Sequence, residues 1–460
     1  MSRVRVEKDS MGEVEVPAGA YYGAQSRRAE DNLPVSGERM PLPVVYAVAL
    51  IKGLAAEVNA GLGLLPESSA DAISRAAKEV LQGKHDDQFI VGVFQTGSGT
   101  STNMNVNEVL ANLANEFLGA PLGKYSPVHP NDHVNRCQSS NDVIPSAIRI
   151  ALRRDISDRL LPALGQLRDA LEGKARAFSQ ILKIGRTHLQ DAVPMTLGQE
   201  FDGYAAQINQ GIRRIEAVLP ELEELPLGGT AIGTGVNAHP EFARRTIAEL
   251  AGSTGIPFRE AVNRFAAMGG QDALVASGGA MKGVAVSLMK IAHDLRLLSS
   301  GPRCGIGEIL LPSLQPGSSI MPGKVNPVVL EATIQVAAQV IGNETTVALA
   351  GSMGVLELNV MLPVMARNLM ESSALLSSIS LLLADRCVAG IEADAKRCDE
   401  LIEKSLSIIT PLSIKIGYNR ASELVYEAYR SGKTIRELLT EKRELSEEEI
   451  NDVLDPRKMI

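Results

Sequence analysis

The feature that most constrains the fold is a series of long apolar stripes with helical spacing in the middle of the chain. Apolar residues recur at intervals of three and four in residues 156–178, 204–222 and 281–298, which places them on one face of a helix. Residues 331–343 and 360–384 carry almost no charge, and helices that are apolar on most sides belong at the centre of a bundle. The sequence predicts a mostly α fold around long helices.

Between and beyond these stripes the pattern changes. Alternating valines between Arg3 and Val16 predict a small N-terminal β ribbon. Glycine-rich stretches at 95–102, 227–237 and 301–327 are too long to be simple connectors, so we expect binding groups there. Shorter helices after about residue 390 include a capping box at Ser446–Glu449. We expect three domains: a mostly helical N-terminal domain with the ribbon (1–138), a central helix bundle carrying loop 317–327 (139–390) and a small helical domain (391–460).

Composition narrows the class of protein. With 460 residues, 45% of them hydrophobic, the chain has ample material for a globular core, and its net charge of -8 is spread without blocks of like charge, which argues against nucleic acid as a partner. The longest uncharged apolar run, residues 372–384, is shorter than the roughly 20 residues that cross a bilayer, so no membrane span is predicted. Residues 1–12 lack an apolar segment, and we expect a cytoplasmic protein. The four cysteines form no C-x-x-C pair and are expected to be free thiols.

Residues 317–327 are dense in chemically useful groups. A phosphate loop would need four residues between its glycines and a hydroxyl after its lysine, whereas five separate Gly317 from Gly323 and a valine follows Lys324. Lys324 and Asn326, close to a helix N-terminus, would instead make a donor-rich site for a carboxylate whose charge grows during a reaction. A serine of the same loop could act as base if the lysine or backbone dipoles favour its alkoxide. A purely structural turn is the alternative.

Three other segments offer polar groups. Gln138–Asp142 and Gly97–Thr100 present hydroxyls and amides that orient a small anion, although helix capping or loop chemistry would also explain them. His188 has the most polar neighbourhood of the six histidines, yet a lone histidine is more often structural than catalytic. His129 and His133 suggest a metal site, but Pro130 interrupts the helix that would carry both, and no third ligand is apparent.

Taken together, these segments resemble the class II fumarases of the fumarase/aspartase superfamily, from residue 9 to residue 459. The signature loop of that family is matched without a gap from Gly317 to Asn326. The resemblance implies reversible hydration of fumarate to L-malate through an aci-carboxylate, without metal or organic cofactor. It also implies a homotetramer whose central domains pool their helices and whose active sites are each shared by three subunits.

The resemblance also assigns roles. Ser318 would be the base that removes the C3 proton of malate, while His188, paired with Glu331, would handle the water. Ser319, Lys324 and Asn326 would bind the substrate carboxylate. The substrate site would be completed by Ser98, Thr100, Ser139, Ser140, Asn141 and Thr187, and an accessory anion site would map to His129, Asn131 and Asp132.

Two alternatives remain beside this interpretation. Aspartases tend to carry glutamine at the position of His188 and differ at Gly97–Thr100 and Met321–Lys324, so these segments favour fumarase. A non-catalytic protein on the same scaffold would be expected to have lost Ser318 or His188, and both are present. The chain departs from the usual fumarase pattern at Gly354–Asn359, at residues 264–266, and at Ser126, where the accessory site is often basic.

Overall fold

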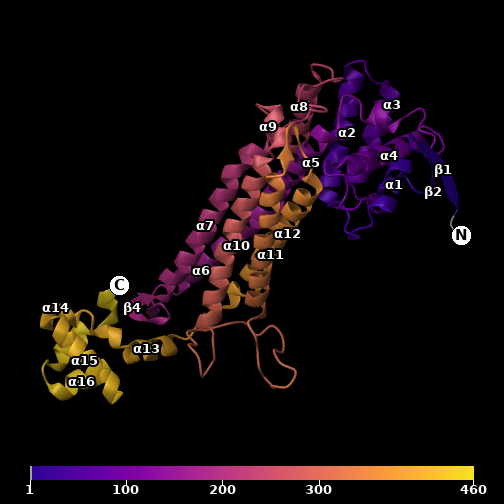
Figure 1. Ribbon diagram of the computed structural model, residues 1–460. Helices are drawn as coiled ribbons and strands as arrows, with labels where there is room; N and C mark the ends of the chain where they lie inside the picture. Colours follow the sequence, from indigo (N-terminus) through magenta and orange to yellow (C-terminus); the bar gives the residue numbers. More distant parts are fainter. Residues whose placement is uncertain (1–2) are drawn as a thin grey trace. The chain divides into compact units, whose positions relative to one another are not determined.

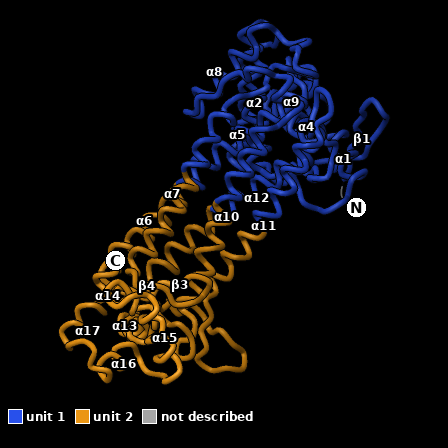
Figure 2. Tube along the Cα trace, turned by 60° about the vertical axis from the view of Figure 1, so that its left-hand side comes forward, with its two compact units in different colours: residues 1–161, 213–283, 339–376 blue, residues 162–212, 284–338, 377–460 orange. Residues whose placement is uncertain are grey.

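The structure, a computed structural model, describes residues 3–460 and confirms the mostly α fold. The chain forms two compact units (Figure 2). Unit 1 contains residues 1–161, 213–283 and 339–376, and unit 2 contains residues 162–212, 284–338 and 377–460. The chain passes between the units five times, once at the first residue of α6 (Leu161–Ala177) and otherwise within four long helices: α7 (Leu197–Leu222), α10 (Asp272–Leu298), α11 (Val328–Gly351) and α12 (Leu362–Arg386). The three-domain division expected from the sequence stays a prediction.

Unit 1 is built around helix α2 (Leu42–Gly61), which packs against α3, α4, α5 and α8. The expected N-terminal ribbon is present as an antiparallel pair in which Val4 lies opposite Pro17 and Asp9 opposite Gly12. The ribbon consists of β1 (Val4–Asp9) and β2 (Gly12–Pro17). The other helices of unit 1 are α1 (Ala24–Asn32), α3 (Glu67–Leu81), α4 (Thr100–Phe117), the π-helical turn η2 (Pro130–Val134), α5 (Ser140–Asp155), α8 (Phe242–Thr254) and α9 (Arg264–Gly269). Its short strands are β5 (Glu224–Leu225), β6 (Arg259–Glu260), β8 (Gly354–Val355) and β9 (Leu358–Asn359).

Unit 2 combines long helices with a small helical subdomain. Helix α6 (Leu161–Ala177) belongs to a bundle with parts of α7, α10, α11 and α12 (Figure 1). The subdomain has an apolar core of its own, formed largely by leucines and isoleucines of residues 402–454. The capping box at Ser446–Glu449 is confirmed. The remaining elements are the hairpin strands β3 (Leu182–Thr187) and β4 (Gln190–Thr196), the paired strands β7 (Ile309–Leu310) and β10 (Glu392–Ala393), and α13 (Ala395–Lys404), α14 (Leu412–Ile416), α15 (Tyr418–Ser431), α16 (Ile435–Lys442) and α17 (Glu447–Val453).

The apolar stripes are buried as expected, with one exception. Leu160, Leu164, Leu167 and Leu171 are fully buried. The expectation that α11 and α12 are buried on most sides is wrong for the single chain, because α11 leaves Leu349 65% exposed and α12 leaves Leu381 and Leu382 partly open to solvent. The sequence shows that these faces lack charge, but it does not show which molecule covers them.

The prediction that no segment is long and apolar enough to span a membrane needs correction. By length and composition alone, three helical segments are apolar enough to cross a membrane: Leu42–Gly61, Asp272–Leu298 and Leu362–Gly390. The expectation from uncharged runs missed them because isolated charges such as Lys52 interrupt each run. In unit 1, α2 buries most of its apolar side chains against neighbouring helices. Its single charge near the middle, Lys52, donates a hydrogen bond to Asn135 (2.7 Å).

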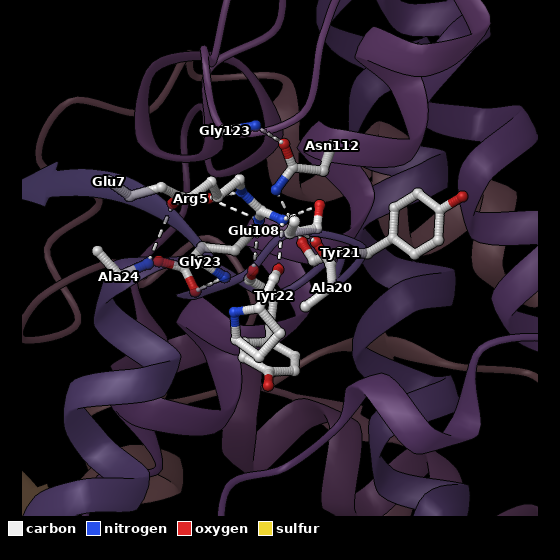
Figure 3. Close-up of polar contacts among 12 residues, drawn as sticks. Arg5, Glu7, Ala20, Tyr21, Tyr22, Gly23, Ala24, Glu108, Asn112 and Gly123 are labelled. Carbon is white, nitrogen blue, oxygen red and sulfur yellow. Dashed lines mark hydrogen bonds and ion pairs between the residues drawn. The ribbon is translucent and has the colours of Figure 1, made fainter. Parts of the chain in front are cut away.

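A buried ionic cluster fixes the N-terminal segment of unit 1 (Figure 3). The Arg5 guanidinium donates hydrogen bonds to four backbone carbonyls between Pro17 and Tyr22 and to Glu7. The Glu108 carboxylate accepts from the amides of residues 23, 25 and 26 at the start of α1, at 2.9–3.1 Å. A Cβ on Gly23 would lie 1.9 Å from the Tyr125 hydroxyl, so only glycine fits there. Glu108 thus supplies the acceptors that the first turn of α1 lacks.

Replacing Glu108 with Ala should destabilise the fold, because two buried amides and one part-buried amide at the start of α1 would lose their acceptor. Since a buried donor left unpaired costs about 1–3 kcal/mol, we expect a loss of at least about 2 kcal/mol in the free energy of unfolding, measured by urea titration. Glu116→Ala, on the exposed side of the same helix, is the control and should change stability by well under 1 kcal/mol. Equal losses in both variants would contradict the assigned role.

Candidate active site

The loop of residues 317–327 is closed by its own hydrogen bonds. The Gly317 amide donates to the Lys324 carbonyl (2.7 Å), and the Asn326 side-chain amide donates to the Gly317 carbonyl (2.6 Å). A Cβ on Gly317 would lie 2.7 Å from the Asn326 nitrogen, and Gly323 has φ +76°, so both positions favour glycine. The Lys324 ammonium makes no ion pair within residues 3–460 and is exposed, just before the N-terminus of α11. A positive, donor-rich end is thus open to an anion.

The Ser318 hydroxyl is held by the backbone of its own loop. Its Oγ accepts hydrogen bonds from the backbone amides of Ile320 (3.2 Å) and Met321 (3.0 Å). Two N–H donors pointing at one oxygen stabilise negative charge on it, which favours the alkoxide over the neutral hydroxyl. The sequence left open whether lysine or backbone dipoles would do this, and the geometry provides the backbone dipoles.

His188 lies at the tip of a β hairpin that the sequence did not predict. Strand β3 ends at Thr187 and β4 begins at Gln190, so His188 and Leu189 form a two-residue turn with φ +57° and +60°. Two positive φ values define a type I′ turn, which normally uses Asn-Gly. Histidine occurs at positive φ more often than most residues, but a bulky leucine rarely does, so Leu189 strains the turn and the sequence carries no Asn-Gly signal for it. Thr187 and His188 are both exposed.

The expected pairing of His188 with Glu331 is not made within one chain. Glu331 lies in the first turn of α11 and is half-buried. Within residues 3–460, neither the His188 ring nor the Glu331 carboxylate makes a hydrogen bond or ion pair. The pairing stays a prediction.

In unit 1, three of the expected hydroxyls form a chain. The Thr100 Oγ1 lies 2.8 Å from the Ser98 Oγ and 2.7 Å from the Ser140 Oγ. Thr100 and Ser140 are the first residues of α4 and α5, and Ser98 precedes α4 by two residues, so two helix N-termini face one small polar region. Gly97 is held against residue 360, since a Cβ on it would meet the Val360 carbonyl oxygen at 1.6 Å. The segment that departs from the fumarase pattern, Gly354–Asn359, therefore lies next to this support.

Ser139 and Asn141 are positioned by Asp142, whose role the sequence only suggested as capping. Ser139 caps α5 in a capping box, with its amide donating to the Asp142 carboxylate (2.9 Å). The other carboxylate oxygen accepts from the amides of Gly228 and Thr230, both at 2.9 Å. Asn141 donates its side-chain amide to the Ala231 carbonyl (2.8 Å). The start of α5 is thereby joined to the glycine-rich loop of residues 227–237.

Burial perturbs the charges behind this segment. Lys52 is completely buried, and desolvation lowers its pKa to about 7 although the nearby Asp142 charge opposes the shift. Desolvation raises the pKa of Asp142 to about 6, against three backbone hydrogen bonds that act the other way. Asn135 links Lys52 to α4, because its Oδ1 also accepts from Asn103 (3.1 Å) and Asn107 (3.2 Å).

The residues of the expected accessory anion site are only partly brought together. A cavity of about 270 Å³ in unit 1 is lined by Asn131, Asp132 and Ser139, among others, but not by His129. The His129 Nδ1 instead accepts from the amides of residues 131 and 132, capping the turn η2. In the described chain, no group of three or more His, Cys, Asp or Glu side chains is arranged to hold a metal ion.

The four cysteines are free thiols, as expected. Cys137, Cys387 and Cys398 are buried and Cys304 is exposed. Burial raises the pKa of Cys387 and of Cys398 to about 12, so both stay protonated at neutral pH.

Comparison with known proteins places this fold and site in a class. Residues 12–342 match the family model described as Lyase, and residues 408–460 match the model described as Fumarase C C-terminus. The chain is 51% identical to the class II fumarate hydratase of Neisseria meningitidis, covering 99% of both chains. It is 49% identical to the mitochondrial fumarate hydratase of Homo sapiens, covering 99% of this chain and 90% of that one. The recombinant class II fumarase of Schistosoma mansoni superposes with a TM-score of 0.97 at 41% identity, covering 99% of both chains.

The helical fold and these matches define a lyase. At about half the residues identical over the full length, the chain belongs to the class II fumarate hydratase family. The resemblance stated from the sequence is thus confirmed.

Lys52 should make the stability of the fold depend on pH. Its pKa of about 7 in the folded state lies below the ordinary 10.5, so unfolding takes up a proton between these values and the free energy of unfolding rises with pH across that window. Asp142 acts in the opposite sense at lower pH, because its pKa is raised from 3.8 to about 6 and stability falls as pH rises through that range. The free energy of unfolding of the wild type should therefore increase relative to that of Lys52→Met between pH 7 and pH 9.

Urea unfolding of both proteins at the two pH values measures this difference. Lys78→Met, which replaces an exposed lysine of α3, is the control and should leave the wild-type pH dependence unchanged. A stability difference between wild type and Lys52→Met that is the same at both pH values would contradict the perturbed lysine.

Proposed function

We propose that this chain is a fumarate hydratase that interconverts fumarate and L-malate without a metal ion. The observation that carries the proposal is Ser318, whose Oγ accepts two backbone amides in a loop that also presents Lys324 beside a helix N-terminus. Abstraction of a proton next to a carboxylate needs a base and a fixed positive site for the extra charge. This loop supplies both from protein groups alone.

In the dehydration direction, Ser318 as alkoxide takes the C3 proton of malate. The electron pair moves into the neighbouring carboxylate, which becomes a doubly charged aci-carboxylate held by Lys324 and Asn326. The C2 hydroxyl then leaves as water after receiving a proton from His188, with which Glu331 would pair. Hydration of fumarate follows the same steps in reverse. Ser319 supports the reacting carboxylate in the signature loop.

The remaining polar residues would orient the substrate. The hydroxyls of Ser98, Thr100 and Ser140 already lie within hydrogen-bond distance of one another and would exchange these contacts for a carboxylate. Ser139 and Asn141, fixed by the Asp142 network, and Thr187 at the end of β3 would complete the binding site. Asn131 and Asp132, which line the neighbouring cavity, and His129 would form the accessory anion site.

We further propose a homotetramer in which three subunits contribute to each active site. Two observations support it: α11 and α12 leave uncharged apolar faces open, and the His188 ring has no hydrogen-bond or ion-pair partner within residues 3–460. Pooling these helices would bury the open faces. We propose a cytoplasmic enzyme that uses neither nucleic acid nor a membrane, in agreement with the dispersed charge and with the burial of α2 inside unit 1.

The proposal is tested by ultraviolet absorbance of the fumarate double bond with EDTA-treated protein and L-malate. We expect absorbance to rise with wild-type protein, and Ser318→Ala to lower kcat by about 10²–10⁴-fold, the usual contribution of a general base. Ser313→Ala, an exposed serine just before the loop, is the matched control and should retain wild-type kcat.

Near-wild-type turnover by Ser318→Ala would show that another group is the base. A rise with L-aspartate but not with L-malate would transfer the chain to the aspartase branch. No rise with either substrate would favour a non-catalytic protein on this scaffold.

Shared active sites predict recovery of activity in mixed tetramers. When Ser318→Ala and His188→Asn chains are produced together in equal amounts, a site that takes the two segments from different subunits receives both intact residues in about a quarter of cases. The mixture should therefore reach about a quarter of wild-type activity in the malate assay.

The control pairs Ser318→Ala with Lys324→Ala, whose lesions lie in the same loop. Each site takes that loop from one chain, so this mixture should stay inactive. Inactivity of the Ser318→Ala and His188→Asn mixture, with mixed tetramers verified by mass, would show that one subunit supplies both residues.

A further inference from the structure

The β3–β4 hairpin in unit 2 holds His188 in a conformation that needs external support. The turn residues His188 and Leu189 both have positive φ, and Leu189 is 72% exposed, so no packing of its side chain stabilises the turn. Residues in such conformations persist only when the surrounding structure fixes them. The support must therefore come from the strands on either side of the turn.

Two cations of β3 reach the same carboxylate. The Lys183 ammonium lies 3.2 Å and the Arg186 guanidinium 2.9 Å from the Glu308 carboxylate. Between them the register of the hairpin shifts, because Gly185 alone lies opposite two residues of β4, Ala192 and Val193, so the extra residue of this bulge belongs to β4. A Cβ on Gly185 would lie 2.8 Å from the Val193 carbonyl oxygen, so the bulged segment of β4 packs directly on this glycine.

Glu308 is a rigid anchor for these cations. Its side chain is fully buried, and its own backbone is held on both sides. The Glu308 amide donates to the Leu298 carbonyl at the end of α10 (2.9 Å), and its carbonyl accepts from the Asp394 amide (3.0 Å). Arg397 donates two further hydrogen bonds to the carbonyls of residues 305 and 306, both at 2.9 Å. The carboxylate therefore cannot follow the hairpin if the hairpin moves.

Apolar packing alone does not fix the position of the turn at the tip of the hairpin. On the opposite face of β3, Ile184 is buried in the core of the C-terminal subdomain. This contact attaches the base of the hairpin, whereas Arg186 is the ionic contact closest in sequence to the turn. Lys183 has a second partner in Glu200 (2.5 Å), but Arg186 has no other carboxylate within residues 3–460.

We propose that Glu308 is a positioning residue for the reaction, which holds His188 in place by fixing Arg186 and Lys183 of β3. The inference rests on the role proposed for His188. Glu308 itself touches neither substrate nor the reacting atoms. Its effect on turnover passes through the hairpin.

The test replaces Glu308 with Gln, which keeps the size of the side chain and removes its charge. Displacement of a catalytic group by about 1 Å can lower rates by about 10²-fold, so we expect kcat for malate to fall by about 10–100-fold with KM changed by less than about threefold. Glu200→Gln is the matched control, because it removes a partner of Lys183 and leaves Arg186 paired. It should lower kcat by less than about threefold.

A double-mutant cycle with His188→Asn separates positioning from general destabilisation. If Glu308 acts through His188, the Glu308→Gln change should lower kcat by less than about threefold once His188 is already asparagine. The same change in wild type should lower it at least tenfold. Thermal melting of the wild type, the two single variants and the double variant identifies losses of folded protein. A further variant, Glu308→Gln/Arg186→Gln, removes the unpaired cation and should recover the melting temperature but not kcat.

The outcomes distinguish the two proposals. Equal losses from Glu308→Gln in the wild-type and His188→Asn backgrounds, or equal losses from Glu308→Gln and Glu200→Gln, would overturn the positioning role and leave the proposed function intact. Recovery of kcat by Glu308→Gln/Arg186→Gln would also overturn it. Wild-type turnover by His188→Asn would instead refute the role of that histidine in the proposed function.

Discussion

A carboxylate removed from water must be surrounded by donors, and this requirement joins the parts of each unit. The Glu108 carboxylate accepts hydrogen bonds from the amides at the start of α1, and the Asp142 carboxylate accepts from the amides of Ser139 and the glycine-rich loop. The Glu308 carboxylate pairs with two cations of β3. Each of these groups is buried and links segments far apart in the sequence. Long helices supply the frame, but these three carboxylates determine where the loops between the helices lie.

The two units contribute different chemistry. Unit 1 offers neutral donors, with hydroxyls and amides at the first turns of α4 and α5. Unit 2 carries the Ser318 hydroxyl with its two backbone amides, the Lys324 ammonium and the His188 imidazole. The neutral donors of unit 1 and the ionisable groups of unit 2 thus lie on separately stabilised scaffolds. A substitution that weakens one scaffold can leave the chemistry of the other intact.

Much of this was accessible from sequence, for physical reasons that differ between elements. The stripes of α6, α7 and α10 have the helical period over several turns, and the ribbon alternates with period two, so both were predicted. The signature loop was recognisable because glycines, a lysine and an amide must follow in fixed order. The hairpin at His188 was missed because its turn lacks Asn-Gly, and Glu308 was missed because a single acid in an apolar stretch gives no local pattern. The exposure of apolar residues on α11 and α12 could not be predicted, because an uncharged stretch has the same pattern whether its faces are buried or open.

The contact of β3 with Glu308 has a consequence for how this segment can change over evolutionary time. Because successive residues of a strand point to opposite faces, the number of residues from Lys183 to His188 matters more than most of their identities. A substitution in β3 alters one contact, whereas inserting or deleting one residue would rotate every later side chain to the other face. The length of the hairpin is therefore constrained, and descendants of this chain can vary its composition far more freely than its length.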